Sequence, residues 1–403
     1  MSRSAHKIVQ TVCSAIAARR DELVHALEAH VAIPTGHNHT PGLDRYRNEI
    51  TGRLAALGAS VEYEAGDLGP DWLRGPREAA AIPPTAICRR EVAGLPRILL
   101  VSHLDTVFDP AGEFTEMVIS PQGDVAVGPG VVDMKGGVLV AVTALEALAA
   151  AGFELSWTYV LNSDEETGSF ASARTLRAQA ARADVGLVTE PALPGGALAI
   201  ARRGAGQFMI EARGRSAHAG RAFEDGVSAV YGLAEVLVSL SHLSDADRGL
   251  VVNVGPISGG GATNVVPDHA AAWGNVRFPD PESADELGRA MDALATPADH
   301  LPAIEVRRTF NRPAKPTTPG VERLANMARQ AAADLGQDLP FQSTGGVCDG
   351  NILQEAGLPV IDTLGVRGGG LHTTEEWIEL DSLVERSQLM ACLLIRLTEE
   401  WNT

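Results

Sequence analysis

The sequence predicts an α/β protein with a mostly parallel mixed sheet in a larger domain and a smaller α+β domain inserted into it. Between residues 97 and 189, short apolar runs alternate with helical stretches, which is the order typical of a parallel sheet. From about residue 204 the pattern changes, and the expected strands and helices form a compact α+β segment of their own. After the proline-rich stretch 313–319 the first pattern resumes, so we expect one domain to interrupt the other.

The larger domain should begin with helices. Helical periodicity spans residues 8–32, and a second helix at 45–57 should end at Gly58. The elements expected next are a strand at 97–102, a helix at 137–151, a strand at 157–162, a helix at 171–181 and a strand at 185–189. Ligands of such sheets bind beyond the carboxyl ends of the strands, so functional residues are expected there.

The inserted domain should be a compact α+β unit of its own. Its expected elements are strands at 207–212, 250–257 and 269–278, a helix at 226–241 and a helix that starts after 279. We therefore expect residues 1–203 and 314–403 to form one discontinuous domain, with residues 204–313 as the insert.

Net charge and cysteine content indicate which classes of partner and which cellular compartment to expect. The chain of 403 residues has 33 Lys and Arg against 51 Asp and Glu, a net charge of −18. This disfavours binding to nucleic acid or to an anionic membrane surface, which both need a basic face. The four cysteines lie far apart without a Cys-x-x-Cys pair, and neither a signal peptide nor a membrane-spanning run is visible. These features favour a soluble, cytoplasmic protein.

Polar residues follow the expected strands. His103 and Asp105 come directly after one strand, where a histidine could bind metal while a carboxylate orients its ring. A turn with a satisfied histidine is the alternative. Glu165 and Glu166 follow the next strand, where adjacent carboxylates can divide metal binding and base catalysis. A solvated acidic turn would have the same sequence.

Three further motifs have similar positions. Asp133 lies in the glycine-rich turn 128–137 before a helix, where it could also be a simple cap. A phosphate-binding loop is less consistent with this turn, because the Gly-Lys-Ser/Thr ending is absent. Glu190 follows a third strand, and His372 follows three glycines that allow the backbone to approach a buried site.

Together and in this order, the motifs resemble the dizinc peptidase family that contains glutamate carboxypeptidases, aminoacylases, acetylornithine deacetylase and succinyl-diaminopimelate desuccinylase. The resemblance spans nearly the whole chain, including the insert. Within the family, the sequence is most similar to the folate-cleaving glutamate carboxypeptidase type. The stretches that indicate this type are residues 164–170, residues 343–346 with Asp349, and residues 359–365.

The resemblance implies a catalytic domain with two Zn²⁺ ions, which Co²⁺ or Mn²⁺ could replace in such a ligand set. Asp133 would bridge the two ions. His103 and Glu190 would complete one site, and Glu166 and His372 the other. A cis peptide bond after Asp133 is also implied.

The resemblance also implies catalytic roles. Asp105 would orient His103, and Glu165 would be the general base that moves a proton from water to the leaving amine. The insert would be a lid and dimerisation domain of a homodimer. Its segment 215–220 matches the family segment whose histidine reaches the partner's active site, so His218 would stabilise the oxyanion. Taken alone, His218 would be read as a surface residue.

Substrate-binding residues follow from the same resemblance. Asn264 and Arg277 match positions that hold the terminal carboxylate of the substrate, a group that arginine binds with two parallel hydrogen bonds. The stretch Thr344, Gly345 and Gly346 would also contact the substrate. Relatives usually carry Asp two residues before this arginine, whereas this chain has Asn275.

The implied activity is zinc-dependent hydrolysis of an amide bond. It would release a C-terminal amino acid, glutamate or another acidic residue, from a small N-acyl or peptidyl substrate. An aminoacylase or deacylase of the same family is the close alternative. A noncatalytic binding relative is the alternative of another class, and it would require the loss of ligands that this chain retains.

Overall fold

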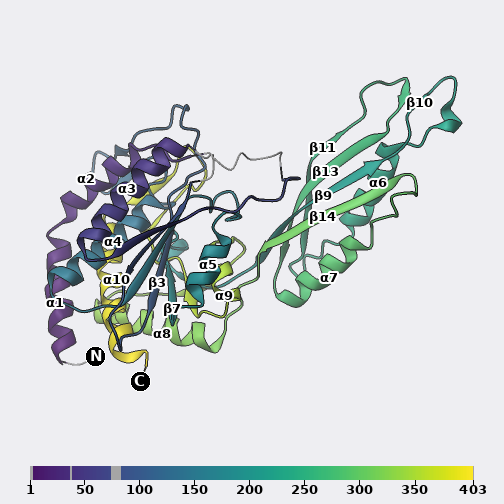
Figure 1. Cartoon of the computed structure of the whole chain (residues 1–403). Coiled ribbons are helices and arrows are strands. Elements are labelled where there is room, and N and C mark those ends of the chain that lie inside the picture. Colours follow the sequence, from purple (N-terminus) through teal and green to yellow (C-terminus); the bar gives the residue numbers. More distant parts are fainter. Residues whose placement is uncertain (1–2, 37–38, 74–82, 403) are drawn as a thin grey trace.

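The computed structural model describes residues 3–36, 39–73 and 83–402, which form two parts with separate sheets (Figure 1). The larger part contains a six-stranded sheet in the order β1-β2-β6-β3-β7-β16. Its strands are β1 (Ser60–Glu64), β2 (Thr85–Arg90), β6 (Trp157–Asn162), β3 (Ile98–His103), β7 (Val185–Val188) and β16 (Val360–Ile361). The strands β6, β3, β7 and β16 pair in parallel, whereas β2 pairs antiparallel with both of its neighbours, β1 and β6. This arrangement confirms the expected mostly parallel mixed sheet.

Helices cover both faces of this sheet. The hydrophobic core on one face includes side chains of α1 (Arg3–Ala17), α2 (Arg20–Val31), α3 (Thr40–Ala56), α4 (Lys135–Ala150), α8 (Pro319–Asp334) and α10 (Asp381–Glu400). The core on the other face includes side chains of α5 (Ala173–Ala180) and α9 (Asp349–Glu355). In β3, Ile98 and Leu100 face the first core, and Leu99 and Val101 face the second. A central strand covered on both faces must be apolar throughout, which explains the continuous run in the sequence.

The prediction of one helix at 8–32 is wrong, because α1 ends at Ala17 and α2 begins at Arg20. Arg19 leaves the helical conformation, and its guanidinium forms ion pairs with Glu22 and Glu146. Both helices bury their apolar sides in the same core, so the hydrophobic periodicity continues across the break and hides it.

The insert contains an antiparallel sheet in the order β11-β13-β9-β14. Its strands are β11 (Val251–Gly259), β13 (His269–Phe278), β9 (Gly204–Arg213) and β14 (Ala303–Arg312). Helices α6 (Ala229–Ser241) and α7 (Pro281–Asp292) cover one face and form a second, separate core with it. Two short strands, β10 (Ala217–His218) and β12 (Val265–Val266), pair with each other, and β10 lies far from the larger part (Figure 1).

The chain leaves and re-enters the larger part at one place. The backbone N–H groups of Arg202 and Lys315 donate to each other's carbonyl oxygens, at 2.9 and 3.0 Å. Arg202 ends β8 (Leu198–Arg202), which pairs in parallel with β15 (Phe341–Thr344). A further small sheet contains β4 (Val118–Ile119), β5 (Val125–Val127), β17 (Gly368–Gly369) and β18 (Trp377–Glu379).

The described residues include no helix that is long and apolar enough to cross a membrane. All four cysteines are described, and none forms a disulfide.

Candidate active site

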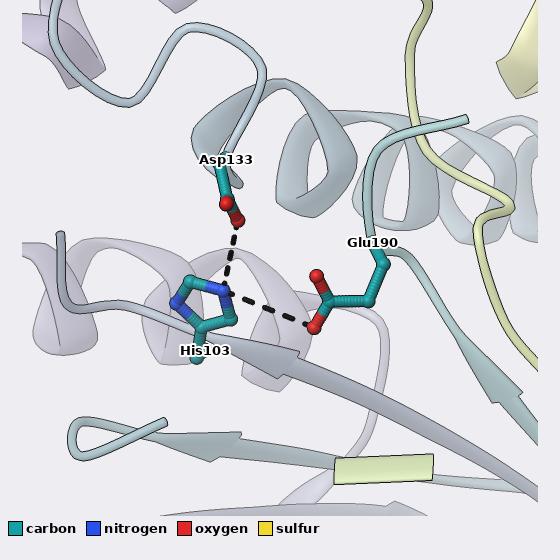
Figure 2. Close-up of side chains that lie close together, drawn as sticks. All are labelled: His103, Asp133 and Glu190. Atoms are coloured by element: carbon teal, nitrogen blue, oxygen red, sulfur yellow. Dashed lines mark hydrogen bonds and ion pairs between the residues drawn. The ribbon is translucent and has the colours of Figure 1, made fainter. Parts of the chain in front are cut away.

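The first group of ligand-type side chains lies at the carboxyl ends of β3 and β7 (Figure 2). His103 is the last residue of β3, Glu190 follows β7, and Asp133 precedes α4. The Nε2 atom of His103 lies 3.2 Å from Oδ1 of Asp133 and 3.9 Å from Oε1 of Glu190. All three side chains are buried, and their ligand atoms lie within 4.8 Å of one another.

A second group shares Asp133 with the first. The Nε2 atom of His372 lies 3.5 Å from Oδ2 of Asp133 and 3.2 Å from Oε2 of Glu166. His372 comes from the loop between β17 and β18, has a positive φ of 62° and is 54% exposed. The two oxygens of Asp133 therefore face the two groups separately. The bond between Asp133 and Met134 is cis, as expected.

The chemistry of the first group fits a divalent cation. Nδ1 of His103 lies 2.9 Å from the carbonyl oxygen of Asp105 and can donate to it, which leaves Nε2 to bind a cation that the two carboxylates also bind. Oε1 of Glu190 is buried and has no hydrogen-bond partner among the described residues. Burial and the nearby Asp133 raise the pKa of Glu190 to about 8. A cation between these nitrogen and oxygen atoms would satisfy all of them, and zinc binds such ligands.

The carboxylate of Asp105 accepts hydrogen bonds from the loop that carries Glu165 and Glu166. Its two oxygens accept the backbone N–H groups of Glu165 and Glu166, at 3.2 and 3.0 Å. Nδ1 of His103 is 3.5 Å from this carboxylate, farther than from the carbonyl oxygen of the same residue. Asp105 thus contacts a residue of the first group through its backbone and the loop of the second group through its side chain.

Glu165 is held by Arg312, a residue that the sequence analysis missed. Nη2 of Arg312 lies 2.6 Å from Oε1 of Glu165 and also donates to its carbonyl oxygen. Nη1 of the same guanidinium lies 2.7 Å from Asp349. Burial raises the pKa of Glu165, and the charge of Arg312 acts in the opposite direction. The charge of Arg312 therefore favours an ionised Glu165.

A second missed residue is Glu376, in the loop that also carries His372. Its side chain is fully buried, and Oε1 accepts the backbone N–H groups of Val132 and Asp133 at 2.9 and 3.1 Å. This contact joins the loops that carry two of the ligand-type residues. The sequence contained a signal, because Glu376 lies four residues after His372 in a run of polar residues.

A cavity of about 680 Å³ lies between the two parts and contains several of the predicted residues. Glu165, Glu166, His372, Arg277 and Gly346 line it. Nη1 of Arg277 donates to Oδ1 of Asn275 at 2.9 Å, so the asparagine can hold this arginine where relatives usually have aspartate.

Four other residues that we predicted at the site do not line this cavity. His218 and Asn264 are exposed and close together, because the N–H of Ala219 donates to the carbonyl oxygen of Asn264. Neither is among the described residues that line the cavity, nor are Thr344 and Gly345. Thr344 ends β15 and accepts a hydrogen bond from Arg203.

Comparison with known proteins identifies the family. Residues 99–396 match Peptidase family M20/M25/M40, which is well over half of the chain. The chain belongs to this peptidase family. It is an M20-family metallopeptidase and therefore an amide-bond hydrolase, so the alternative of a noncatalytic relative is not supported.

Relatives in the M20 family cover most of the chain. Carboxypeptidase G2 from Pseudomonas sp. (strain RS-16) is 28% identical over 385 residues, which are 93% of this chain and 89% of that protein. Succinyl-diaminopimelate desuccinylase from Dechloromonas aromatica is 27% identical over 333 residues, 78% and 86% of the two chains. The fold is shared with YxeP of Bacillus subtilis, described as a dinuclear metal binding peptidase of the M20 family, with a TM-score of 0.66, 17% identity and coverage of 95% and 99%.

Proposed function

We propose that the protein releases a C-terminal glutamate, or another acidic residue, from an N-acyl or peptidyl substrate, with two zinc ions as cofactors. One observation carries this proposal: the guanidinium of Arg277 and the carboxylate of Glu165 line the same cavity as two ligand-type residues, Glu166 and His372. A cation that can bind a carboxylate is thus available in the cavity that holds the hydrolytic groups. The similarity to carboxypeptidase G2 supports the same reaction class.

The ligand roles follow from the two groups of side chains. Asp133 would bridge the ions, His103 and Glu190 would hold one, and Glu166 and His372 would hold the other. Bound metal ions of this kind lower the pKa of water and polarise a carbonyl group.

The chain's own residues would carry out the remaining steps. Arg277 would bind the terminal carboxylate of the substrate and place its amide bond beside Glu165. Glu165 would accept a proton from the attacking water and donate it to the nitrogen of the leaving amino acid. Arg312, held on its other side by Asp349, would keep the carboxylate of Glu165 in place and oppose the rise in its pKa that burial causes.

The insert, residues 204–313, would be a lid and dimerisation domain. His218 and Asn264 lie together but outside the cavity of their own chain. In a homodimer they would reach the active site of the partner, where His218 would donate to the oxyanion and Asn264 would contact the substrate. Thr344, Gly345 and Gly346 would contact the substrate from the larger part.

The test is hydrolysis of a matrix of N-acyl and N-peptidyl amino acids by zinc-loaded protein. Preferential release of glutamate or aspartate from different acyl groups would support the proposal. Preference for one acyl group with many different amino acids would instead favour an aminoacylase. Equal cleavage of a substrate whose terminal carboxylate is amidated would rule out the role of Arg277 and the carboxypeptidase assignment.

A further inference from the structure

A segment of the larger part, residues 65–73, extends toward the sheet of the insert (Figure 1). We call it the strap. At its beginning it is tied to the larger part, because the N–H of Asp67 donates to the carbonyl oxygen of Ala171 at 3.1 Å. The carboxylate of Asp67 also accepts from Arg174 at 3.0 Å.

The other end of the strap is tied to the insert. The indole N–H of Trp273, in β13, donates to the carbonyl oxygen of Trp72 at 2.9 Å, and both side chains are half-buried. Arg307 lies 3.9 Å from the carboxylate of Asp71, but Asp71 is 84% exposed, and such an ion pair contributes little. The hydrogen bond from Trp273 is therefore the principal tie between the strap and the insert.

Between these ties, the strap forms part of the cavity. Gly69, Pro70 and Leu73 line it together with Phe170. A Cβ atom built on Gly69 would lie 3.4 Å from Cβ of Phe170, so the backbone of the strap packs directly against this side chain. These four residues form an apolar part of the lining, whereas Arg277 and Asn275 are among the polar residues that line the rest of the cavity.

We propose that the strap and Phe170 form a subsite for an apolar or aromatic acyl group of the substrate, and that Trp273 fixes the position of this subsite. The inference rests on the proposed function, because the acyl group is the part of the substrate that Arg277 does not bind. Burial of apolar surface against Pro70, Leu73 and Phe170 favours a large acyl group over a small one. An acetyl group has little apolar surface that could pack against these three side chains.

The experiment compares N-benzoyl-L-glutamate with N-acetyl-L-glutamate. The leaving amino acid is the same in both, so the ratio of their KM values reports on the acyl subsite alone. For Leu73→Ala we expect the KM of the benzoyl substrate to rise roughly 10-fold, the size of effect typical of a hydrophobic pocket. The KM of the acetyl substrate, kcat and metal content should change less than about 2-fold on the same argument.

Trp273→Phe tests the tie while keeping an aromatic ring. Loss of one hydrogen bond should raise the KM of the benzoyl substrate by about 2- to 10-fold, without a matching change for the acetyl substrate. Leu68→Ala is the matched control, because Leu68 belongs to the strap but is 60% exposed and does not line the cavity. An equal effect on both substrates, or an equal effect of Leu68→Ala, would overturn the proposal.

Calorimetric binding in a Glu165→Gln background separates this proposal from the proposed function. Selective binding of N-benzoylglutamate that Leu73→Ala abolishes would support the subsite even if the wild-type protein cleaved neither compound. In that case the proposed function alone would fail. If the protein cleaved both compounds but bound them with equal affinity, the subsite would be contradicted and the proposed function would stand.

Discussion

The guanidinium of Arg312 lies 2.6 Å from the carboxylate of Glu165, and the two side chains are only 3% and 11% exposed. Arg312→Ala should therefore leave the carboxylates of Glu165 and Asp349 without their cation and destabilise the fold by about 3–5 kcal/mol. Arg308→Ala is the control, because Arg308 is on the same strand but its partner Asp292 is 53% exposed, and its loss should cost about 1 kcal/mol or less. Urea unfolding measures both values. If Arg312→Ala lowered the free energy of unfolding as little as Arg308→Ala, the ion pair between Arg312 and Glu165 would be unimportant for stability.

Glu165→Ala should retain both metal ions but lose activity, because Glu165 would move protons without binding metal. General acid–base groups contribute about 10²- to 10⁴-fold, so kcat should fall by at least that range. Metal analysis and steady-state kinetics provide the measurement. Glu166→Ala is the matched comparison, since its loss should also remove metal. Retention of more than about a tenth of kcat by Glu165→Ala would exclude it as the base.

Removal of metal should destabilise the protein. A ligand present at about 100 times its Kd stabilises the folded state by about 2.7 kcal/mol, so a chelator should lower Tm and added zinc should restore it. The His103→Ala variant should respond less to zinc, because His103 belongs to the first ligand group. Differential scanning calorimetry with and without chelator provides the test. A Tm unaffected by chelator or zinc would contradict metal binding at these residues.

Arg277→Ala should impair substrate binding and leave metal content unchanged. Hydrogen bonds to charged groups contribute about 1.5–3 kcal/mol, which corresponds to roughly a 10- to 150-fold loss in kcat/KM. Most of the loss should appear in KM. Arg277→Lys should recover only part, because a lysine cannot form two parallel hydrogen bonds to a carboxylate. Full activity of Arg277→Ala would remove this residue from substrate recognition.

Heterodimers provide the test for His218. If His218 acts in the partner's site, His218→Ala and Glu165→Ala homodimers should each be nearly inactive. Subunit exchange between them should restore partial activity, because one site of the heterodimer then has both residues intact. Light scattering should report a dimer. A fully active monomer, or no recovery after confirmed exchange, would contradict this arrangement.

The parts of the fold that the sequence predicted are those with strong local patterns. The strands β3, β6 and β7 are apolar because helices cover both faces of the sheet. His103 ends β3, and Glu165 lies in the loop after β6. By contrast, β14 contains Arg307 and Arg308 on a partly exposed strand and has no clear apolar alternation. Its pairing with β9 determines its conformation, and this long-range contact is not visible in a local window.

The residues that hold the candidate site in place could not be predicted from the sequence for the same reason. Arg312 meets Glu165 across 147 residues of sequence, and Glu376 meets Asp133 across 243. In the sequence, Arg312 is an ordinary cation before a proline-rich joint. Only the packing of the two parts brings it to a carboxylate, so its role depends on tertiary structure rather than on a motif.

The mutual hydrogen bonds between Arg202 and Lys315 hold the two ends of the intervening segment side by side. Since its two ends already touch, a short turn could close the remaining chain without stretching any strand of the six-stranded sheet. All five candidate metal ligands lie outside residues 204–313 and would remain after this excision, whereas Arg277 and Arg312, the partner of Glu165, would be lost. The candidate metal ligands and the proposed carboxylate-binding Arg277 are thus encoded in two regions of one polypeptide that have separate hydrophobic cores.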